Sequence, residues 1–191
     1  NPVISVNGNT VVLAGKELVR VASVLSCPIE VNLYYSTPER ISGLLSILEE
    51  HKGLVSEEPG PEGFEGNWGK AVEAVPLLGE DHDCRIEGLE GPRSLCTKVG
   101  IGSADCILVP LEDGDRCEAL VGSGREVIVV DLNPLSRSSI MATVTIVDEI
   151  ARASKILLEE LLGGGNGASE WDNTEGLRHS LSCMADSVRR F

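Results

Sequence analysis

Aromatic residues are scarce in this chain of 191 residues, at 3% of the sequence. So few rings, scattered along the chain, do not make the stacking platform on which single-stranded nucleic acids bind. Basic residues are outnumbered as well, with 16 Lys and Arg against 30 Asp and Glu and a formal net charge of −14. Because this charge repels a phosphate backbone, nucleic acid is excluded as an expected partner.

Long apolar runs are also absent. No run approaches the roughly 20 residues that span a bilayer, and no signal-peptide pattern opens the chain, so we expect a cytoplasmic protein with no membrane partner. The first residues, Asn1-Pro2, stand directly before a β-rich run without a methionine. We therefore expect a segment upstream of this chain.

The six cysteines include no Cys-x-x-Cys pair, and no histidine stands at a zinc-finger spacing from two of them. We interpret them as reduced thiols and assign no metal ligands. His82 and Cys84, in the acidic run Asp-His-Asp-Cys, are interpreted as part of a loop.

Four common site motifs are missing from the sequence. Neither Gly-x-Gly-x-x-Gly nor Gly-x-x-x-x-Gly-Lys-[Ser/Thr] occurs, so a standard dinucleotide site and a P-loop lose their main support. Gly-x-Ser-x-Gly and His-Glu-x-x-His are absent too. No catalytic nucleophile is therefore assigned.

The patterns that are present alternate between strand and helix. Residues 3–6 and 29–34 read as strands, and apolar residues at helical spacing predict helices over 16–26 and from Thr37-Pro38 to about 53. Apolar runs at 104–111 and 127–130 predict strands buried on both faces, with helices near 117–121 and 150–161 and a short strand at 143–147. This order predicts one α/β domain over 1–162, with a mostly parallel sheet flanked by helices.

Two segments depart from the alternation. Residues 53 to about 95 are rich in Gly, Pro and acids, which predicts an exposed loop insertion; a functional lid is the less favoured alternative. Residues 163–191 start with a Gly-rich linker and continue as an amphipathic helix. Packing of that helix on its own domain is favoured over a subunit contact. Its apolar stripe consists of Leu177, Leu181, Met184 and Val188.

Polar residues follow the predicted strands at the edge where ligands bind in open α/β sheets. Asp131 is placed to accept hydrogen bonds from ribose hydroxyls, with capping of the next turn as the alternative. Arg137 and Ser138 suit phosphate oxygens, although a surface salt bridge explains Arg137 equally well. The acidic turn 112–116 would suit Mg²⁺, but a solvated capping turn is favoured.

Four ordered blocks resemble the archaeal phosphopantothenate synthetase family, also called 4-phosphopantoate:β-alanine ligase. They are Asn-Pro-Val-Ile-Ser-Val-Asn-Gly-Asn at 1–9, Pro-Ile-Glu-Val-Asn-Leu at 28–33, Val-Pro-Leu-Glu-Asp-Gly-Asp-Arg at 109–116 and Val-Asp-Leu-Asn-Pro-Leu-Ser-Arg-Ser at 130–138. The resemblance covers about residues 1–160. Ser138 stands where the family usually has threonine.

The resemblance implies a Rossmann-like homodimer that acts in coenzyme A biosynthesis. It implies that ATP, with Mg²⁺, activates 4-phosphopantoate as an acyl-adenylate and that β-alanine then displaces AMP. Family members also contact ATP through arginines upstream of the first block. The nucleotide contacts that carry over are Asp131, Leu132, Asn133, Arg137, Ser138, Glu149 and Ile150.

Three asparagines are hypotheses for contacts with the acyl substrate, on location alone: Asn7, Asn9 and Asn32. The rival interpretation of the whole chain is a non-catalytic nucleotide-binding module of the same fold. A dehydrogenase is less favoured because the glycine fingerprint is missing.

Overall fold

A computed structural model describes residues 1–164, 167 and 170–188, and it confirms the predicted α/β fold. Six parallel strands form one sheet in the order β3-β2-β1-β6-β7-β8. The strands are β1 (Pro2–Val6), β2 (Ile29–Val31), β3 (Leu77–Leu78), β6 (Cys106–Pro110), β7 (Glu126–Val130) and β8 (Val144–Ile146). A separate antiparallel pair joins β4 (Cys84–Arg85) to β5 (Leu95–Cys96).

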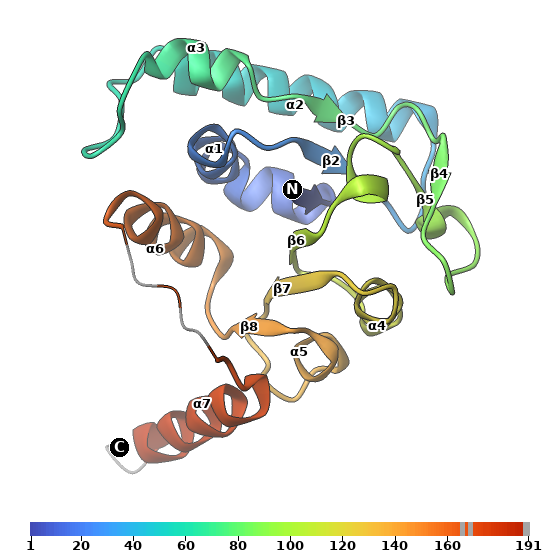
Figure 1. The fold of residues 1–191 in the computed structure, drawn as a ribbon, viewed down its shortest axis with the longest axis vertical. Helices are drawn as coiled ribbons and strands as arrows, with labels where there is room; N and C mark the ends of the chain where they lie inside the picture. The colour runs from blue at the N-terminus through green and yellow to red at the C-terminus, as the bar shows by residue number, and fades with distance from the viewer. Residues whose placement is uncertain (165–166, 168–169, 189–191) are drawn as a thin grey trace.

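Helices cover both faces of the sheet (Figure 1). The helices α1 (Gly8–Leu25), α2 (Pro38–Ser56), α3 (Trp68–Glu73) and α6 (Ile150–Leu162) pack on one side. The other side carries α4 (Gly114–Gly122), α5 (Arg137–Met141) and the β4–β5 pair. Each side has its own apolar core, as expected for a sheet whose parallel strands are joined by helices.

The central strands are buried on both faces, as their continuous apolar runs predict. In β6, Ile107 and Val109 point into the core beneath α4, whereas Leu108 belongs to the core beneath α1 and α6. This alternation is the period of two that a pleated strand imposes. Because these strands are parallel, the loops that follow β1, β2, β6 and β7 all leave the sheet at the carboxyl ends of the strands. These loops carry the polar residues described below.

Helix α1 starts at Gly8, eight residues before the position that apolar spacing predicted. The Asn7 side chain accepts hydrogen bonds from the N–H groups of Asn9 and Thr10, and the Thr10 hydroxyl accepts one from the Asn7 N–H. This capping box starts the helix directly after β1. Ala14 departs from helical geometry, with φ −142°, which explains why the apolar stripe is regular only beyond it.

The segment 53–95 is not a simple exposed loop. Helix α2 continues to Ser56, and α3 buries Trp68 and Val72 against the core beneath α1 and α2. Strand β3 then pairs with β2 and completes one edge of the sheet. A strand of two residues and a helix of six are too short to produce a periodic pattern, so sequence analysis did not detect them.

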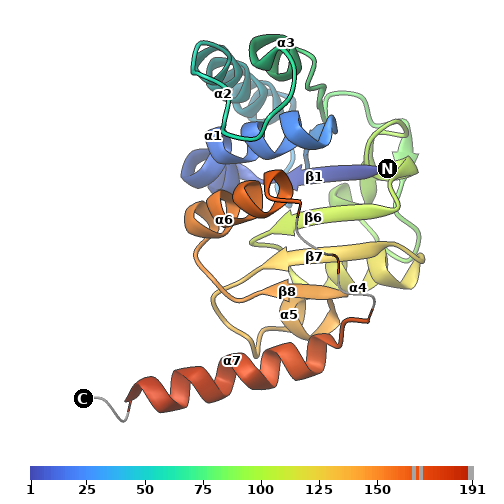
Figure 2. The same ribbon diagram turned by 60° about the vertical axis from the view of Figure 1, so that its left-hand side comes forward.

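The predicted C-terminal helix is α7 (Asn173–Val188). Asn173 donates to the carbonyls of Ser139 and Ala142, at 2.8 and 3.0 Å, and Leu177 is buried. Further along the helix Met184 is 42% exposed and Val188 is 73% exposed, and Figure 2 shows α7 extending away from the sheet. Packing on the domain therefore accounts for the first turns of α7 but not for the rest of its apolar stripe.

The linker predicted over 163–167 includes residues 165–166, which lie outside the described residues. Among the described helices, none is long and apolar enough to cross a membrane.

Candidate active site

The loop after β7 is braced by its own polar groups. Asp131 accepts from the Asn133 N–H at 2.9 Å and from the Ser136 hydroxyl at 2.6 Å. The Ser139 hydroxyl donates to the Asn133 carbonyl at 2.9 Å. Both Asp131 oxygens therefore hold the loop, as the capping alternative expects, and each keeps a further lone pair for a ligand. Leu132 and Asn133 are exposed on the same turn.

Arg137 and Ser138 follow this loop but face different surroundings. The Arg137 guanidinium is exposed and forms ion pairs with Asp115 and Glu118 of α4, as the salt-bridge alternative expects. Ser138 is 4% exposed, and its hydroxyl donates to the Glu112 carbonyl at 2.6 Å. The Ser138 hydroxyl thus joins the first turn of α5 to the loop after β6 and is engaged inside the protein.

Glu149 and Ile150 lie at the start of α6. Glu149 is the N-cap, and its carboxylate accepts from the N–H groups of Ala151 and Arg152 at 2.8 and 3.0 Å. These backbone hydrogen bonds lower the pKa of Glu149. Ile150 is buried. The Asp131 N–H donates to Ile146 at the end of β8, so the two predicted nucleotide-contact segments adjoin at the sheet edge.

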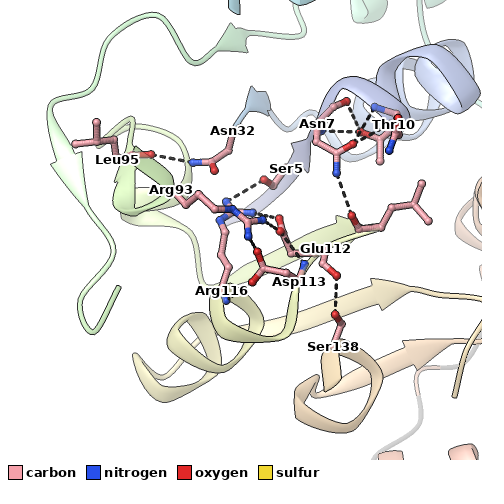
Figure 3. A network of polar contacts seen from close by, with 12 residues as sticks. Ser5, Asn7, Thr10, Asn32, Arg93, Leu95, Glu112, Asp113, Arg116 and Ser138 are labelled. Atoms are coloured by element: carbon pink, nitrogen blue, oxygen red, sulfur yellow. Dashed lines mark hydrogen bonds and ion pairs between the residues drawn. The ribbon is translucent and has the colours of Figure 1, made fainter. Parts of the chain in front are cut away.

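The three asparagines have different environments, and Figure 3 shows two of them, Asn7 and Asn32. Asn7 caps α1 and also donates to the Leu111 carbonyl at 3.0 Å. Asn9 is exposed and uses its N–H in the cap. Asn32 donates to the Leu95 carbonyl at 2.8 Å, while its Oδ1 is buried without a partner in the described structure. A buried acceptor of this kind calls for a further donor, so Asn32 is the best ligand candidate of the three.

The β6 loop is held on both sides by these contacts. Asn7, the N-cap of α1, contacts this loop from one side, and Ser138 of α5 contacts it from the other. Leu111, whose carbonyl accepts the Asn7 hydrogen bond, adopts a left-handed backbone with φ 54°, a conformation that costs energy in a branched aliphatic residue. The acyl-substrate side and the nucleotide side of the proposed site therefore share one constrained turn.

A buried charge network lies beneath this turn (Figure 3). Arg116 is fully buried, forms an ion pair with Glu112 and donates to the Ser5 hydroxyl at 3.0 Å. Burial lowers the pKa of Arg116 to about 10. Arg93 forms ion pairs with Glu112 and Asp113. Charges removed from water are tolerated where they are paired in this way.

Glu30 of β2 is a second buried carboxylate, next to this network. It accepts from the N–H groups of Thr97 and Ile101, at 2.8 and 2.7 Å. Burial raises the pKa of Glu30, and the two hydrogen bonds and the Arg116 charge oppose that rise. Glu30 thereby attaches the segment between β5 and β6 to the sheet.

Two cavities open at this end of the molecule. One, of about 540 Å³, lies between Tyr34, Arg93 and the start of α4. The other, of about 470 Å³, has apolar walls at Ile41 and Leu95 and polar groups at Thr37 and His82. The two cavities are adjacent. Tyr34 of the first and Thr37 of the second both belong to the loop after β2, and Arg93 of the first directly follows Pro92 of the second.

The residues at the acidic turn are not arranged as a preformed metal centre. Within the described residues, no three His, Cys, Asp or Glu side chains are placed to hold a metal ion together. Asp113 caps α4 by accepting from the Arg116 N–H at 2.9 Å, which confirms the capping part of the favoured prediction. The turn is not solvated throughout, because the side chains of Glu112 and Arg116 are buried in an ion pair. A Mg²⁺ ion here would need phosphate oxygens among its ligands.

Sequence analysis missed Arg93 and Glu30 as organising residues. Arg93 lies in the aperiodic 53–95 segment, and nothing in its neighbourhood marks it. Glu30 is buried in β2, between Ile29 and Val31. An acid flanked by two apolar strand residues was the sequence feature that could have indicated a buried carboxylate. Neither residue's partners are close in sequence.

Comparison with known proteins shows the family to which the chain belongs. A family model described as phosphopantothenate/pantothenate synthetase matches residues 1–63 and 65–185. A 4-phosphopantoate–β-alanine ligase of Thermococcus onnurineus is 44% identical over 198 residues, which is 100% of this chain and 68% of the relative. The Thermococcus kodakarensis protein of the same name is 43% identical over 201 residues, again 100% and 68%.

A third relative, from Methanospirillum hungatei and also named 4-phosphopantoate–β-alanine ligase, is 44% identical over 153 residues. That match covers 80% of this chain and 54% of the relative. The chain thus spans between about half and two thirds of the length of these relatives. Since the family model and both Thermococcus proteins match nearly the entire chain, the chain belongs to the phosphopantothenate/pantothenate synthetase family.

Proposed function

We propose that this protein joins 4-phosphopantoate to β-alanine and so forms 4'-phosphopantothenate for coenzyme A biosynthesis in the cytoplasm. The observation that carries the proposal is the identity of 43–44% over the whole chain with two proteins that bear this ligase name. The four sequence blocks at the ligand edge of the sheet support it, because they contain the polar groups that the reaction needs.

In the proposed reaction a carboxylate oxygen of 4-phosphopantoate attacks the α-phosphorus of ATP, and pyrophosphate leaves. The amine nitrogen of β-alanine, after losing a proton, then attacks the acyl carbon. An amide bond forms, the bond between the acyl carbon and the AMP oxygen breaks, and AMP leaves as the nitrogen loses its second excess proton. Positioning of the substrates and stabilisation of the departing charge supply much of the rate in such transfers.

ATP, with Mg²⁺, is assigned to the loops after β7 and β8. The proposed contacts are Asp131, Leu132, Asn133, Arg137, Ser138, Glu149 and Ile150. Since the Ser138 hydroxyl donates to Glu112, its contribution to nucleotide binding would come from its backbone or from a hydroxyl lone pair. The cavity of about 470 Å³ suits the branched acyl chain of phosphopantoate, because Ile41, Pro38 and Leu95 line it.

The homodimer is part of the same proposal. The exposed Met184 and Val188 on α7 supply an apolar surface that the described chain leaves uncovered. Light scattering combined with size-exclusion chromatography tests the homodimer. We expect the mass of two chains, and a mass of one 20.3 kDa chain would contradict the dimer.

The deciding experiment measures AMP release from Mg·ATP with 4-phosphopantoate, with and without β-alanine. It uses this chain and, in parallel, the full translation product of its gene. AMP release that depends on β-alanine establishes the ligase. ATP binding without AMP formation by either protein would overturn the proposal in favour of a non-catalytic nucleotide-binding module.

A further inference from the structure

The cavity of about 540 Å³ adjoins the proposed nucleotide site and has no assigned occupant. Its walls come from the loop after β2, the segment before β5 and the first turns of α4. The side chains that matter for its chemistry are Tyr34, Glu90, Arg93, Asp113, Asp115 and Glu118. Four carboxylates therefore face one guanidinium.

The single cation on the wall is already neutralised. Arg93 forms ion pairs with Asp113 and with Glu112 beneath it, and its guanidinium carbon lies 5.3 Å from the Tyr34 ring centre. The ring and the two carboxylates hold the guanidinium in one place. The cavity consequently retains an excess of negative charge from Glu90, Asp115 and Glu118.

Arg137 is the group that compensates part of this charge. It forms ion pairs with both Asp115 and Glu118 from outside the cavity wall. Its side chain lies directly across Gly114, where a Cβ would meet the Arg137 Cβ, Cγ and Cδ atoms at 2.4 to 2.7 Å. The absence of a side chain at the first position of α4 thus lets Arg137 reach the two carboxylates.

ATP would compete for the same guanidinium. In the proposed function Arg137 contacts the nucleotide, and a triphosphate is a stronger anionic partner than two exposed carboxylates. Movement of Arg137 to ATP would leave Asp115 and Glu118 unpaired on the cavity wall. Their oxygens would then be available to a cation next to the activated carboxyl group.

We propose that Asp115 and Glu118 bind the ammonium group of β-alanine and that ATP binding releases them from Arg137 for this purpose. The inference rests on the proposed function and extends it to the amine subsite. A small zwitterion fits this cavity: its ammonium end meets the two carboxylates, and Arg93 has further N–H groups for its carboxylate end. The phosphate and carboxylate of 4-phosphopantoate, in contrast, would be repelled by the acidic wall.

The test separates the amine step from adenylate formation. Hydroxylamine is uncharged at neutral pH and traps acyl-adenylates without an ammonium site, so it replaces β-alanine in a parallel assay. Asp115→Asn and Glu118→Gln are compared with Glu65→Gln, which changes an exposed carboxylate in the loop before α3. All variants are made in the full translation product.

We expect each test variant to raise the KM for β-alanine by about two- to fivefold, the range for an exposed ion pair. AMP release with hydroxylamine should not fall below the parent value. The KM for ATP should stay equal or become lower, because each variant removes a carboxylate that competes with ATP for Arg137. Glu65→Gln should match the parent throughout. An unchanged KM for β-alanine would overturn the inference. An equal loss with hydroxylamine, or a raised requirement for Mg²⁺, would also overturn it and would place the two carboxylates in the adenylation step. If the parent releases AMP with neither β-alanine nor hydroxylamine, the proposed function fails, and the inference fails with it.

The ATP requirement is tested by calorimetric titration of β-alanine into the parent with and without a non-hydrolysable ATP analogue. We expect the analogue to tighten β-alanine binding by at least about threefold. Equal affinity in both states would overturn the release of the two carboxylates by ATP.

Discussion

Arg116 and Glu112 form an ion pair inside the protein, in which the guanidinium is fully buried and the carboxylate is 4% exposed. Glu112 lies just before Asp113, the N-cap of α4, and Arg116 lies in the first turn of that helix, so the turn that starts α4 brings the two side chains together. Glu112 also pairs with Arg93, and the Arg116 charge acts on Glu30 in the neighbouring strand. The ligand edge of the sheet therefore rests on a charge network that has little contact with water.

Removal of Arg116 should destabilise the protein strongly. Arg116→Met leaves Glu112 short of a buried partner, so we expect the free energy of unfolding to fall by about 3 kcal/mol or more. Urea denaturation of the parent and the variant measures this free energy. Arg178→Met, at an exposed position of α7, should stay within about 0.5 kcal/mol of the parent. A loss under about 1 kcal/mol for Arg116→Met would show that the network contributes little.

Gly100 should tolerate no side chain. A Cβ there would lie 2.0 Å from the Glu30 Oε2 and 2.8 Å from the Leu78 Cδ1, so Gly100→Ala should cost about 1–3 kcal/mol through overpacking. Gly122→Ala is the matched control, because nothing lies within 4 Å of its Cβ at the end of α4. That change should be neutral or slightly stabilising. Thermal unfolding of Gly100→Ala and Gly122→Ala measures the difference in melting temperature. Equal melting temperatures for the two variants would contradict the close packing at Gly100.

Glu30 should give stability a recognisable pH dependence. Its pKa is raised in the folded protein, so folding takes up a proton in the window above the ordinary value of about 4.3. Within that window the contribution of Glu30 to stability falls as pH rises. Glu30→Gln cannot titrate, so its stability relative to the parent should increase with pH up to the folded pKa and then become constant. Urea unfolding across a pH series measures this, and parallel curves would refute a raised pKa.

Arg137 should matter for ATP and little for folding. Its ion pairs are exposed, so Arg137→Ala should change the free energy of unfolding by less than about 0.5 kcal/mol. Loss of a phosphate contact should raise the KM for ATP by about tenfold or more. Steady-state kinetics with Arg178→Ala as control checks both values. Unchanged ATP kinetics would remove Arg137 from the nucleotide site.

The variant Asp131→Asn tests whether Asp131 binds the nucleotide or only braces the loop after β7. Asp131→Asn keeps one acceptor oxygen but weakens the loop contacts to Asn133 and Ser136, and it removes the negative charge offered to ribose. We expect a higher KM for ATP with a small change in melting temperature. A lower melting temperature with an unaltered KM would assign Asp131 to the structural role alone.

Local patterns in the sequence were enough to predict the architecture. Continuous apolar runs predicted β6 and β7, and Thr37-Pro38 marked the start of α2, because burial and helix capping depend on residues next to each other in the chain. The same patterns failed over 53–95, where β3 is defined by pairing with β2 and not by any periodicity of its own.

The sequence by itself determined the alternation of strands and helices, and it marked which polar residues follow strands at the ligand edge. Only the tertiary structure decided which of them meet. Arg93 reaches Glu112 across 19 residues, Glu30 reaches Ile101 across 71, and Arg116 reaches Ser5 across 111. Partners this distant are brought together by the parallel crossovers, and the pairing of two distant side chains leaves no mark on the residues beside either of them.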